Sequence, residues 1–148
     1  MLKKGLIIIC LILTFLKGNS ETYFIKSNGN DNLNGLSITN AWQSINKVNS
    51  FAFKPNDTVL FEGGSTFLGS VYLQSFINGT KGKSIVIGSY GNSKATISSS
   101  NNSGFYAYNN ECITVQDLIF VGSGYTNNTT IGVCFYLDYT NNKINKNI

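Results

Sequence analysis

The sequence has no histidine, no arginine and only one proline. It therefore has no imidazole for acid–base catalysis or metal binding, and no guanidinium to clamp an anion with two parallel hydrogen bonds. Its seven acidic residues are scattered along the chain, and no two of them adjoin. No catalytic constellation is recognisable, so we assign no catalytic residue and no cofactor from the sequence.

The first twenty residues have the pattern of an export signal. Two lysines near the start precede the apolar run 5–16, and Gly18 and Ser20 are the small residues that a signal peptidase requires. The alternative is a retained membrane anchor. A helix of twelve residues rises only about 18 Å, however, whereas the hydrocarbon core is about 30 Å thick. We expect residues 1–20 to be a signal peptide and the protein to be secreted or displayed at the cell surface.

Removal of this segment would also change the charge of the chain. Three of the eleven lysines would leave with it, so eight lysines would remain against seven acidic residues. The sequence pI of about 9.0 is therefore no indication of nucleic-acid binding. We expect one modest domain over residues 21–148, monomeric, with no retained transmembrane segment.

The chain is rich in asparagine and has fifteen glycines, which is typical of an all-β chain with many turns. Short apolar runs between these turns predict strands. They lie at residues 22–25, 58–61, 71–73, 84–87, 95–97, 105–107, 113–115, 118–120 and 133–137.

One helix is predicted, over Ala41–Val48. Asn40 would cap it, Gln43 occupies the capping-box position, and Trp42 and Ile45 begin an apolar face. That face continues to Val48 at helical spacing.

Residues 113–120 predict a sharp bend between two strands. The apolar positions alternate within each half, with one extra residue at Gln116-Asp117. Apolar segments also recur at 27, 28 and 31 residues, between Val59 and Val86, Ile85 and Ile113, and Ile113 and Ile144. Such a period is typical of a solenoid, in which each repeat turns corners, although a β-sandwich would also suit strands this short.

The order of motifs over residues 22–123 resembles the N-terminal portion of right-handed parallel β-helix proteins of the pectate-lyase-like superfamily. After the first strand, the loop 28–35 and the helix, three segments carry the likeness. They are Lys54-Pro55-Asn56-Asp57-Thr58-Val59, Gly63-Gly64-Ser65-Thr66-Phe67-Leu68-Gly69 and the segment 79–91, which includes Ser89-Tyr90-Gly91. At position 56 the family usually has glycine, and asparagine also tolerates a left-handed backbone.

The resemblance implies an all-β, right-handed parallel β-helix (solenoid) with an N-terminal capping helix. Residues 140–148 are polar, and we expect the solenoid to be incomplete at the C-terminus. Many members of the superfamily are polysaccharide lyases, which use bound Ca²⁺, or glycoside hydrolases, which use paired acids, and in both the site usually lies on later repeats. We therefore expect an N-terminal fragment of a secreted protein that acts on polysaccharide, which could be acidic. A non-catalytic adhesin or carbohydrate-binding solenoid is the alternative.

The loop after the first strand is the best candidate for a metal site. Asn30, Asp31, Asn32 and Asn34 precede Gly35 and echo the alternating oxygen ligands of a calcium loop. Asparagine replaces aspartate at the alternating positions, so a hydrogen-bonded turn is the alternative. Asp57 in a turn and Asp117 at the bend are expected to be structural.

Two further groups of side chains are candidates for function. Cys112 and Cys134 are 22 residues apart, and in an exported protein they could form a disulfide or remain two buried thiols. Tyrosines could stack on sugar rings, or on one another along the solenoid. The candidates are Tyr106, Tyr108, Tyr125, Tyr136 and Tyr139.

Overall fold

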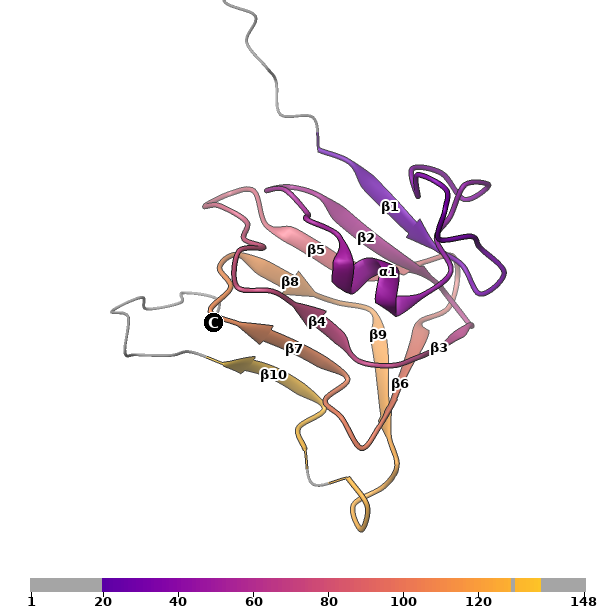
Figure 1. The fold of residues 1–148 in the computed structure, drawn as a ribbon, viewed down its shortest axis with the longest axis vertical. Coiled ribbons are helices and arrows are strands. Elements are labelled where there is room, and N and C mark those ends of the chain that lie inside the picture. The colour runs from indigo at the N-terminus through magenta and orange to yellow at the C-terminus, as the bar shows by residue number, and fades with distance from the viewer. Residues whose placement is uncertain (1–19, 129, 137–148) are drawn as a thin grey trace, which may run out of the picture.

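The computed structural model describes residues 20–128 and 130–136 (Figure 1). The predicted signal peptide therefore lies almost entirely outside the described residues. Within them the chain forms ten strands and one short helix, α1 (Ile45–Ser50). The strands are β1 (Thr22–Ile25), β2 (Thr58–Glu62), β3 (Thr66–Leu68), β4 (Val71–Leu73), β5 (Ile85–Tyr90), β6 (Ala95–Ser100), β7 (Phe105–Tyr108), β8 (Ile113–Val115), β9 (Leu118–Gly122) and β10 (Val133–Tyr136).

The strands form three sheets in which every strand pair is parallel. Their orders are β1-β2-β5-β8, β3-β6-β9 and β10-β7-β4. From β2 onward the chain visits the three sheets in a fixed rotation, so β2-β3-β4, β5-β6-β7 and β8-β9-β10 are three successive repeats. The expected all-β class is confirmed.

The register of the first sheet tests the predicted spacing. Ile85 pairs with Ile113, as the interval of 28 residues predicted. Val59, however, pairs with Ile87 and not with Val86, whose partner is Thr58. The predicted interval of 27 was wrong by one residue, because side chains of a strand alternate between faces and only an even shift keeps Val59 and its partner inside. Ile144 lies outside the described residues.

The alternate residues that point inward make one continuous apolar core between the three sheets. Its fully buried members include Ile25, Val59, Phe61, Val71, Leu73, Ile85, Ile87, Ile97 and Phe105. The predicted bend is present: β8 and β9 belong to different sheets, and Asp117 between them has a φ of 53°, in the left-handed region. With this extra residue the chain turns the corner, and the inward positions Ile113 and Val115 resume at Leu118 and Phe120.

Three local predictions were wrong. The helix begins at Ile45, with Ser44 as its cap, because Trp42 is held extended by hydrogen bonds with both Phe24 and Lys26 of the first strand and its end. Neither Asn40 nor Gln43 therefore caps it. The short strand β3 was not predicted, and β5 continues through Tyr90, where a turn was expected. In each case pairing with a neighbouring strand overrides the local turn signals.

Other segments of the chain cover the N-terminal end of the stacked strands. Trp42 pairs along the outer edge of β1, and its indole stacks on Tyr23 at 5.0 Å between ring centroids. Phe51 and Phe53 complete an aromatic cluster with these two rings. Helix α1 lies against β4 (Figure 1), where the Asn49 side chain bonds the Ser70 carbonyl and the Tyr72 amide at 2.9 Å each.

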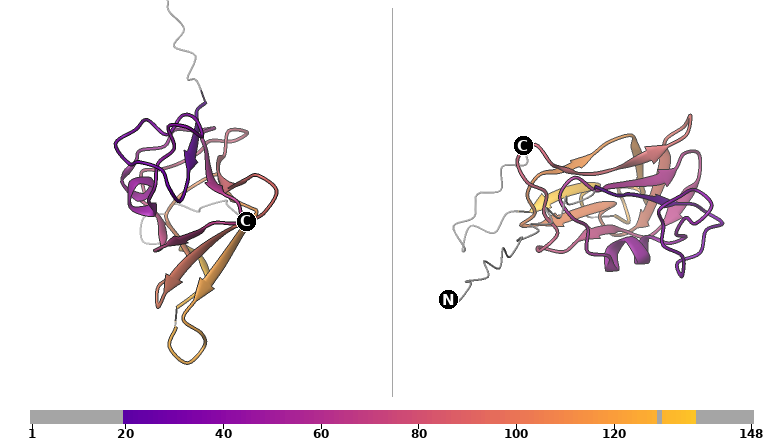
Figure 2. Two further views of the ribbon diagram at one scale, coloured as in Figure 1. Left: turned by 90° about the vertical axis from the view of Figure 1, so that its right-hand side faces the viewer. Right: turned by 90° about the horizontal axis from the view of Figure 1, so that it is seen from above.

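The C-terminal end of the stacked strands, at β8, β9 and β10, is less covered. Among the described residues no strand pairs with the far edges of β8, β9 and β10. Figure 2 shows that the loop after β9 extends away from the strands rather than across this end. The inward side chains Val133 and Phe135 of β10 are consequently exposed to solvent.

Candidate functional site

Tyrosines cover the outward face of the sheet β10-β7-β4. Tyr72, Tyr106 and Cys134 are in register across its three strands, and Tyr108 pairs with Tyr136 two positions further along. Parallel in-register pairing places these side chains in rows, one above the next. We call the four tyrosines with Cys134 the tyrosine face.

The rings of each row are nearly parallel, and their centroids are further apart than in close face-to-face contact. The Tyr72 and Tyr106 ring centroids are 5.6 Å apart with planes at 14°, and those of Tyr108 and Tyr136 are 5.4 Å apart at 10°. These separations exceed the contact distance of about 3.5–4.0 Å between stacked carbons, so the rings overlap only in part. Each ring therefore keeps part of one flat face uncovered.

The outermost rings are the most accessible. Tyr72 is 39% exposed and Tyr136 is 49% exposed, whereas Tyr106 and Tyr108 are half-buried between neighbours. Burial, with smaller contributions from Cys134, Tyr72 and Tyr136, raises the pKa of the Tyr106 hydroxyl. That phenol therefore stays neutral and able to donate a hydrogen bond at neutral pH.

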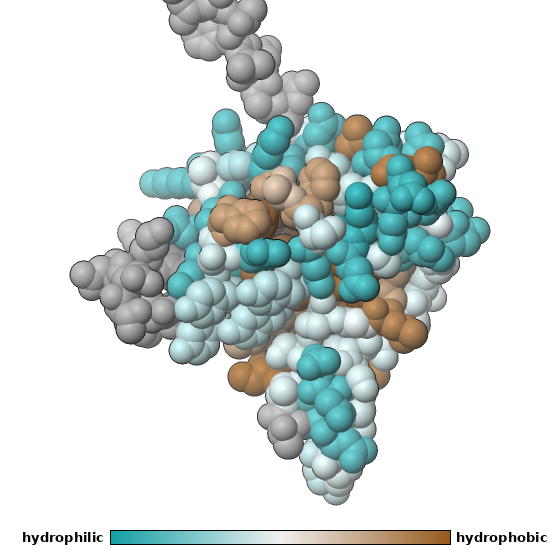
Figure 3. Space-filling model, in the orientation of Figure 1, coloured by the Kyte–Doolittle hydropathy of each residue, from teal (hydrophilic) through white to brown (hydrophobic). Residues whose placement is uncertain are grey.

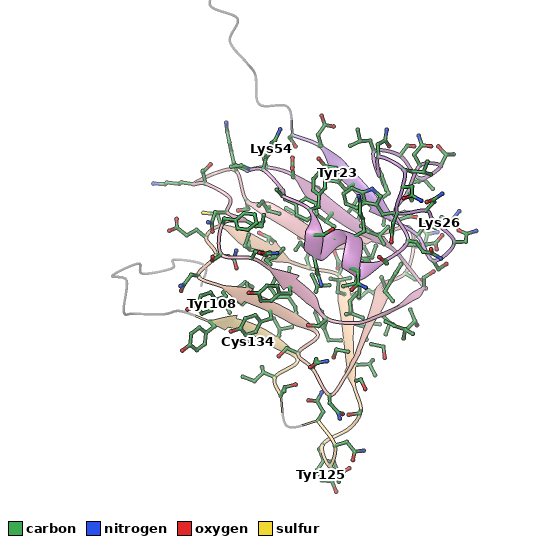
Figure 4. The ribbon with its side chains drawn as sticks, viewed as in Figure 1. Tyr23, Lys26, Lys54, Tyr108, Tyr125 and Cys134 are labelled. Carbon is green, nitrogen blue, oxygen red and sulfur yellow. The ribbon has the colours of Figure 1, made fainter. Side chains whose placement is uncertain are left out.

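The surface around the tyrosine face is weakly polar. Figure 3 shows a pale area over β4, β7 and β10, in contrast to the hydrophilic colour over the N-terminal loops. In Figure 4 Tyr108 and Cys134 lie together on this sheet, whereas Lys26 and Lys54 lie at other parts of the molecule. The strand sequences Val71-Tyr72-Leu73, Phe105–Tyr108 and Val133–Tyr136 contain no charged residue.

The structure brings together three of the five tyrosines that the sequence singled out. Tyr125 is 95% exposed on the loop after β9, far from Tyr108 in Figure 4. Tyr139 lies outside the described residues. Tyr72 was missed, although its place between two inward residues of the predicted strand 71–73 was a usable signal.

Hydrogen bonds within the chain hold the loop that was predicted to bind calcium. Asp31 accepts from the Gln43 amide at 2.7 Å, and from the Ser44 amide and hydroxyl at 3.0 and 2.6 Å. Burial opposes ionisation of Asp31, but these bonds outweigh it and lower the pKa of its carboxyl. The carboxylate thus anchors the loop to the start of α1.

The neighbouring amides make local turns. The Asn30 side chain accepts from the Asn32 amide at 2.9 Å, and the Asn34 side chain accepts from the Leu36 amide at 3.0 Å. Within residues 20–128 and 130–136, no three Cys, Asp or Glu residues form a metal-binding group. A calcium site at Asn30, Asp31, Asn32 and Asn34 stays a prediction.

The two acids expected to be structural have different surroundings. Asp57 is fully buried and accepts from the Lys54 and Glu21 amides at 2.8 and 3.0 Å, so it fixes its turn and the approach to β1. Asp117 is exposed, and its carboxylate lies 3.9 Å from the Lys94 ammonium.

Cys112 and Cys134, the cysteines of the described residues, lie next to different sheets and are not bonded to each other. Cys112 immediately precedes β8 and its carbonyl accepts from the Ile85 amide, whereas Cys134 is in β10. Both are half-buried. A bridge between them stays a prediction.

No family model matches this chain, and no curated protein matches it. Among solved structures, it is similar to the GH136 lacto-N-biosidase from Eubacterium ramulus. The selenomethionine derivative is 26% identical with a TM-score of 0.65, over 76% of this chain and 23% of that one. The native protein is 27% identical with a TM-score of 0.61, over 71% and 21%. The chain thus spans less than a quarter of the length of these structures. In the part of the chain that the structure describes, no helix is long and apolar enough to cross a membrane.

Proposed function

We propose that this chain is part of a secreted, carbohydrate-active protein whose fold is a right-handed parallel β-helix of the pectate-lyase-like kind, and that it binds glycan through the tyrosine face. The observation that carries the proposal is the set of partly uncovered tyrosine rings on one parallel sheet.

The fold supports this proposal in two ways. Three parallel sheets visited in fixed rotation are what a β-helix requires, and the covered start fits the N-terminal portion of one. The solved structures similar to this chain are of a glycoside hydrolase, with identities of 26% and 27%. A glycan too large to enter a cell is also a suitable target for a protein with an export signal.

The chemistry of the tyrosine face supports it as well. The C–H groups on one side of a pyranose ring pack on the flat face of an aromatic ring, and phenol hydroxyls can bond to sugar hydroxyls. Tyrosine suits this because it offers both groups on a stiff side chain. The rings are held by rigid strands, so little conformational entropy would be lost on binding.

Binding of the exported chain to a panel of neutral and acidic oligosaccharides tests the proposal. The variant Tyr72→Ala/Tyr136→Ala should lose at least about tenfold in affinity, which corresponds to about 1.4 kcal/mol. Tyr125→Ala removes an equally large ring from a loop outside the face and should bind like the parent. Failure to bind any glycan, or undiminished binding by a folded double variant, would contradict the proposal.

A further inference from the structure

We infer that the tyrosine face selects uncharged glycans and accommodates two neighbouring sugar rings, one on each row of tyrosines. This inference rests on the proposed function, since it specifies the ligand of the same surface. It goes against the expectation, drawn from the resemblance, that the polysaccharide could be acidic.

The arrangement of the rows defines the size of the ligand. Tyr106 and Tyr108 are two residues apart on β7, so their rows are separated by about 6.6 Å along the strand. Within each row the rings lie 5.4 to 5.6 Å apart and overlap in part. Each row thus offers one continuous aromatic strip, and two strips side by side can each receive one pyranose ring.

The charge distribution defines the class of ligand. The face of an aromatic ring carries negative potential, which attracts the weakly positive C–H groups of a neutral sugar and repels a carboxylate. None of the three strands supplies a cation, so a uronate would lose hydration without gaining a charged partner. Glu111, exposed three positions after Tyr108, adds negative charge beyond that end of β7.

Four of the six lysines of the described residues can be placed away from the tyrosine face. The Lys47 ammonium lies over the Trp42 ring, 5.4 Å from its centroid, and Lys94 is beside Asp117. Lys26 and Lys54 lie away from Tyr108 and Cys134 in Figure 4. These four positive charges are therefore engaged or distant, which favours a neutral ligand further.

Cys134 offers a direct reporter of occupancy. It is the Cα partner of Tyr106 and points to the same outward face, and its thiol is half-buried. A glycan lying across the rows would cover it and slow its alkylation. Because Cys112 also carries a thiol, the measurement uses the variant Cys112→Ser, in which only Cys134 can react among the cysteines of the mature chain.

The experiment compares β-galacto-oligosaccharides with the same sugars oxidised at C6 to uronates. The neutral sugars should slow maleimide labelling of Cys134 at least threefold, and the oxidised sugars should leave it unchanged. Protection by the neutral sugar should disappear in Tyr72→Ala/Tyr136→Ala and persist in Tyr125→Ala.

The outcomes separate this inference from the proposed function. Equal or better protection by the oxidised sugars, lost in the double variant, would overturn neutral selectivity and leave glycan binding by the tyrosine face intact. Binding in the oligosaccharide panel without any change in Cys134 labelling would overturn both, since the glycan would then bind elsewhere. A dependence of neutral-sugar binding on salt concentration would also count against the inference.

Discussion

The N-terminal and C-terminal ends of the three sheets differ in how much of the apolar core they expose to water. At the start, the edge of β1 is paired by Trp42 and the edge of β4 by the side chain of Asn49. At the other end, β8, β9 and β10 have no further strand partner in the described part of the chain. Phe53 at the start is 5% exposed and Phe135 at the other end is 39% exposed.

A hollow of about 430 Å³ opens between β8, β9 and β10. Its apolar lining includes Ile113, Val115, Leu118, Phe120, Val133 and Phe135. The core is thus covered at one end of the sheets and accessible at the other. Parallel strands stack well on one another but leave the last strand of each sheet unpaired, so irregular segments must cover it.

Removing one phenylalanine ring at each end of the sheets should give the largest difference in stability between two variants. Phe53→Ala should lower the free energy of unfolding by about 3–5 kcal/mol, because it leaves a cavity in a packed aromatic cluster. Phe135→Ala should cost about 1 kcal/mol, since much of that ring is already in water. Urea unfolding of both variants measures the difference. Equal costs would show that the second end is covered in solution.

Asp31 tests how firmly the N-terminal loop is attached. Asp31→Asn should lower the free energy of unfolding by about 1–2 kcal/mol at neutral pH, because charge-assisted bonds to Ser44 and Gln43 are weakened. The carboxyl's pKa is lowered by folding, so its contribution is present above the ordinary value of 3.8 and is lost as pH falls through the folded pKa.

Unfolding of the parent and Asp31→Asn across pH checks this prediction, and their stabilities should converge below pH 3.8. Asp117→Asn is the matched control. Its partner Lys94 and Asp117 itself are both mostly exposed, so the change should cost little at any pH. A pH-independent gap between the parent and Asp31→Asn would show that packing, not charge, anchors the loop.

Substitution of Asn49 should have the smallest effect on global stability, but it should clearly increase local opening at the edge of β4. Asn49→Ala should cost about 1 kcal/mol, since it leaves the Ser70 carbonyl and Tyr72 amide without that partner. Hydrogen exchange at the Tyr72 amide should quicken, while exchange at the inner amides of β7 stays slow. Unchanged protection of Tyr72 would mean that the helix, rather than this side chain, shields the edge of β4.

Local patterns predicted much of the strand content. Short apolar runs between turns located nine of the ten strands, and the extra residue at Gln116-Asp117 located a corner. These succeeded because both depend on neighbours in the sequence. The start of α1 could not be predicted in this way, because Trp42 pairs with Ile25 of β1, which is distant in the sequence.

The candidate site was predicted only in part. Tyr106, Tyr108 and Tyr136 were singled out as aromatics that could stack, yet nothing near them in the sequence indicates that they share a face with Tyr72. That depends on register between strands about thirty residues apart, and a shift by one residue would turn each ring inward.

Composition and short apolar runs between turns were enough to predict an all-β, turn-rich chain without histidine or arginine chemistry, because both are local properties of the sequence. The tertiary structure alone decided which tyrosines form one surface, where α1 begins and which end of the sheets is covered. These features arise when edges far apart in the chain satisfy one another's hydrogen bonds and bury shared apolar surface, and no local pattern records that pairing.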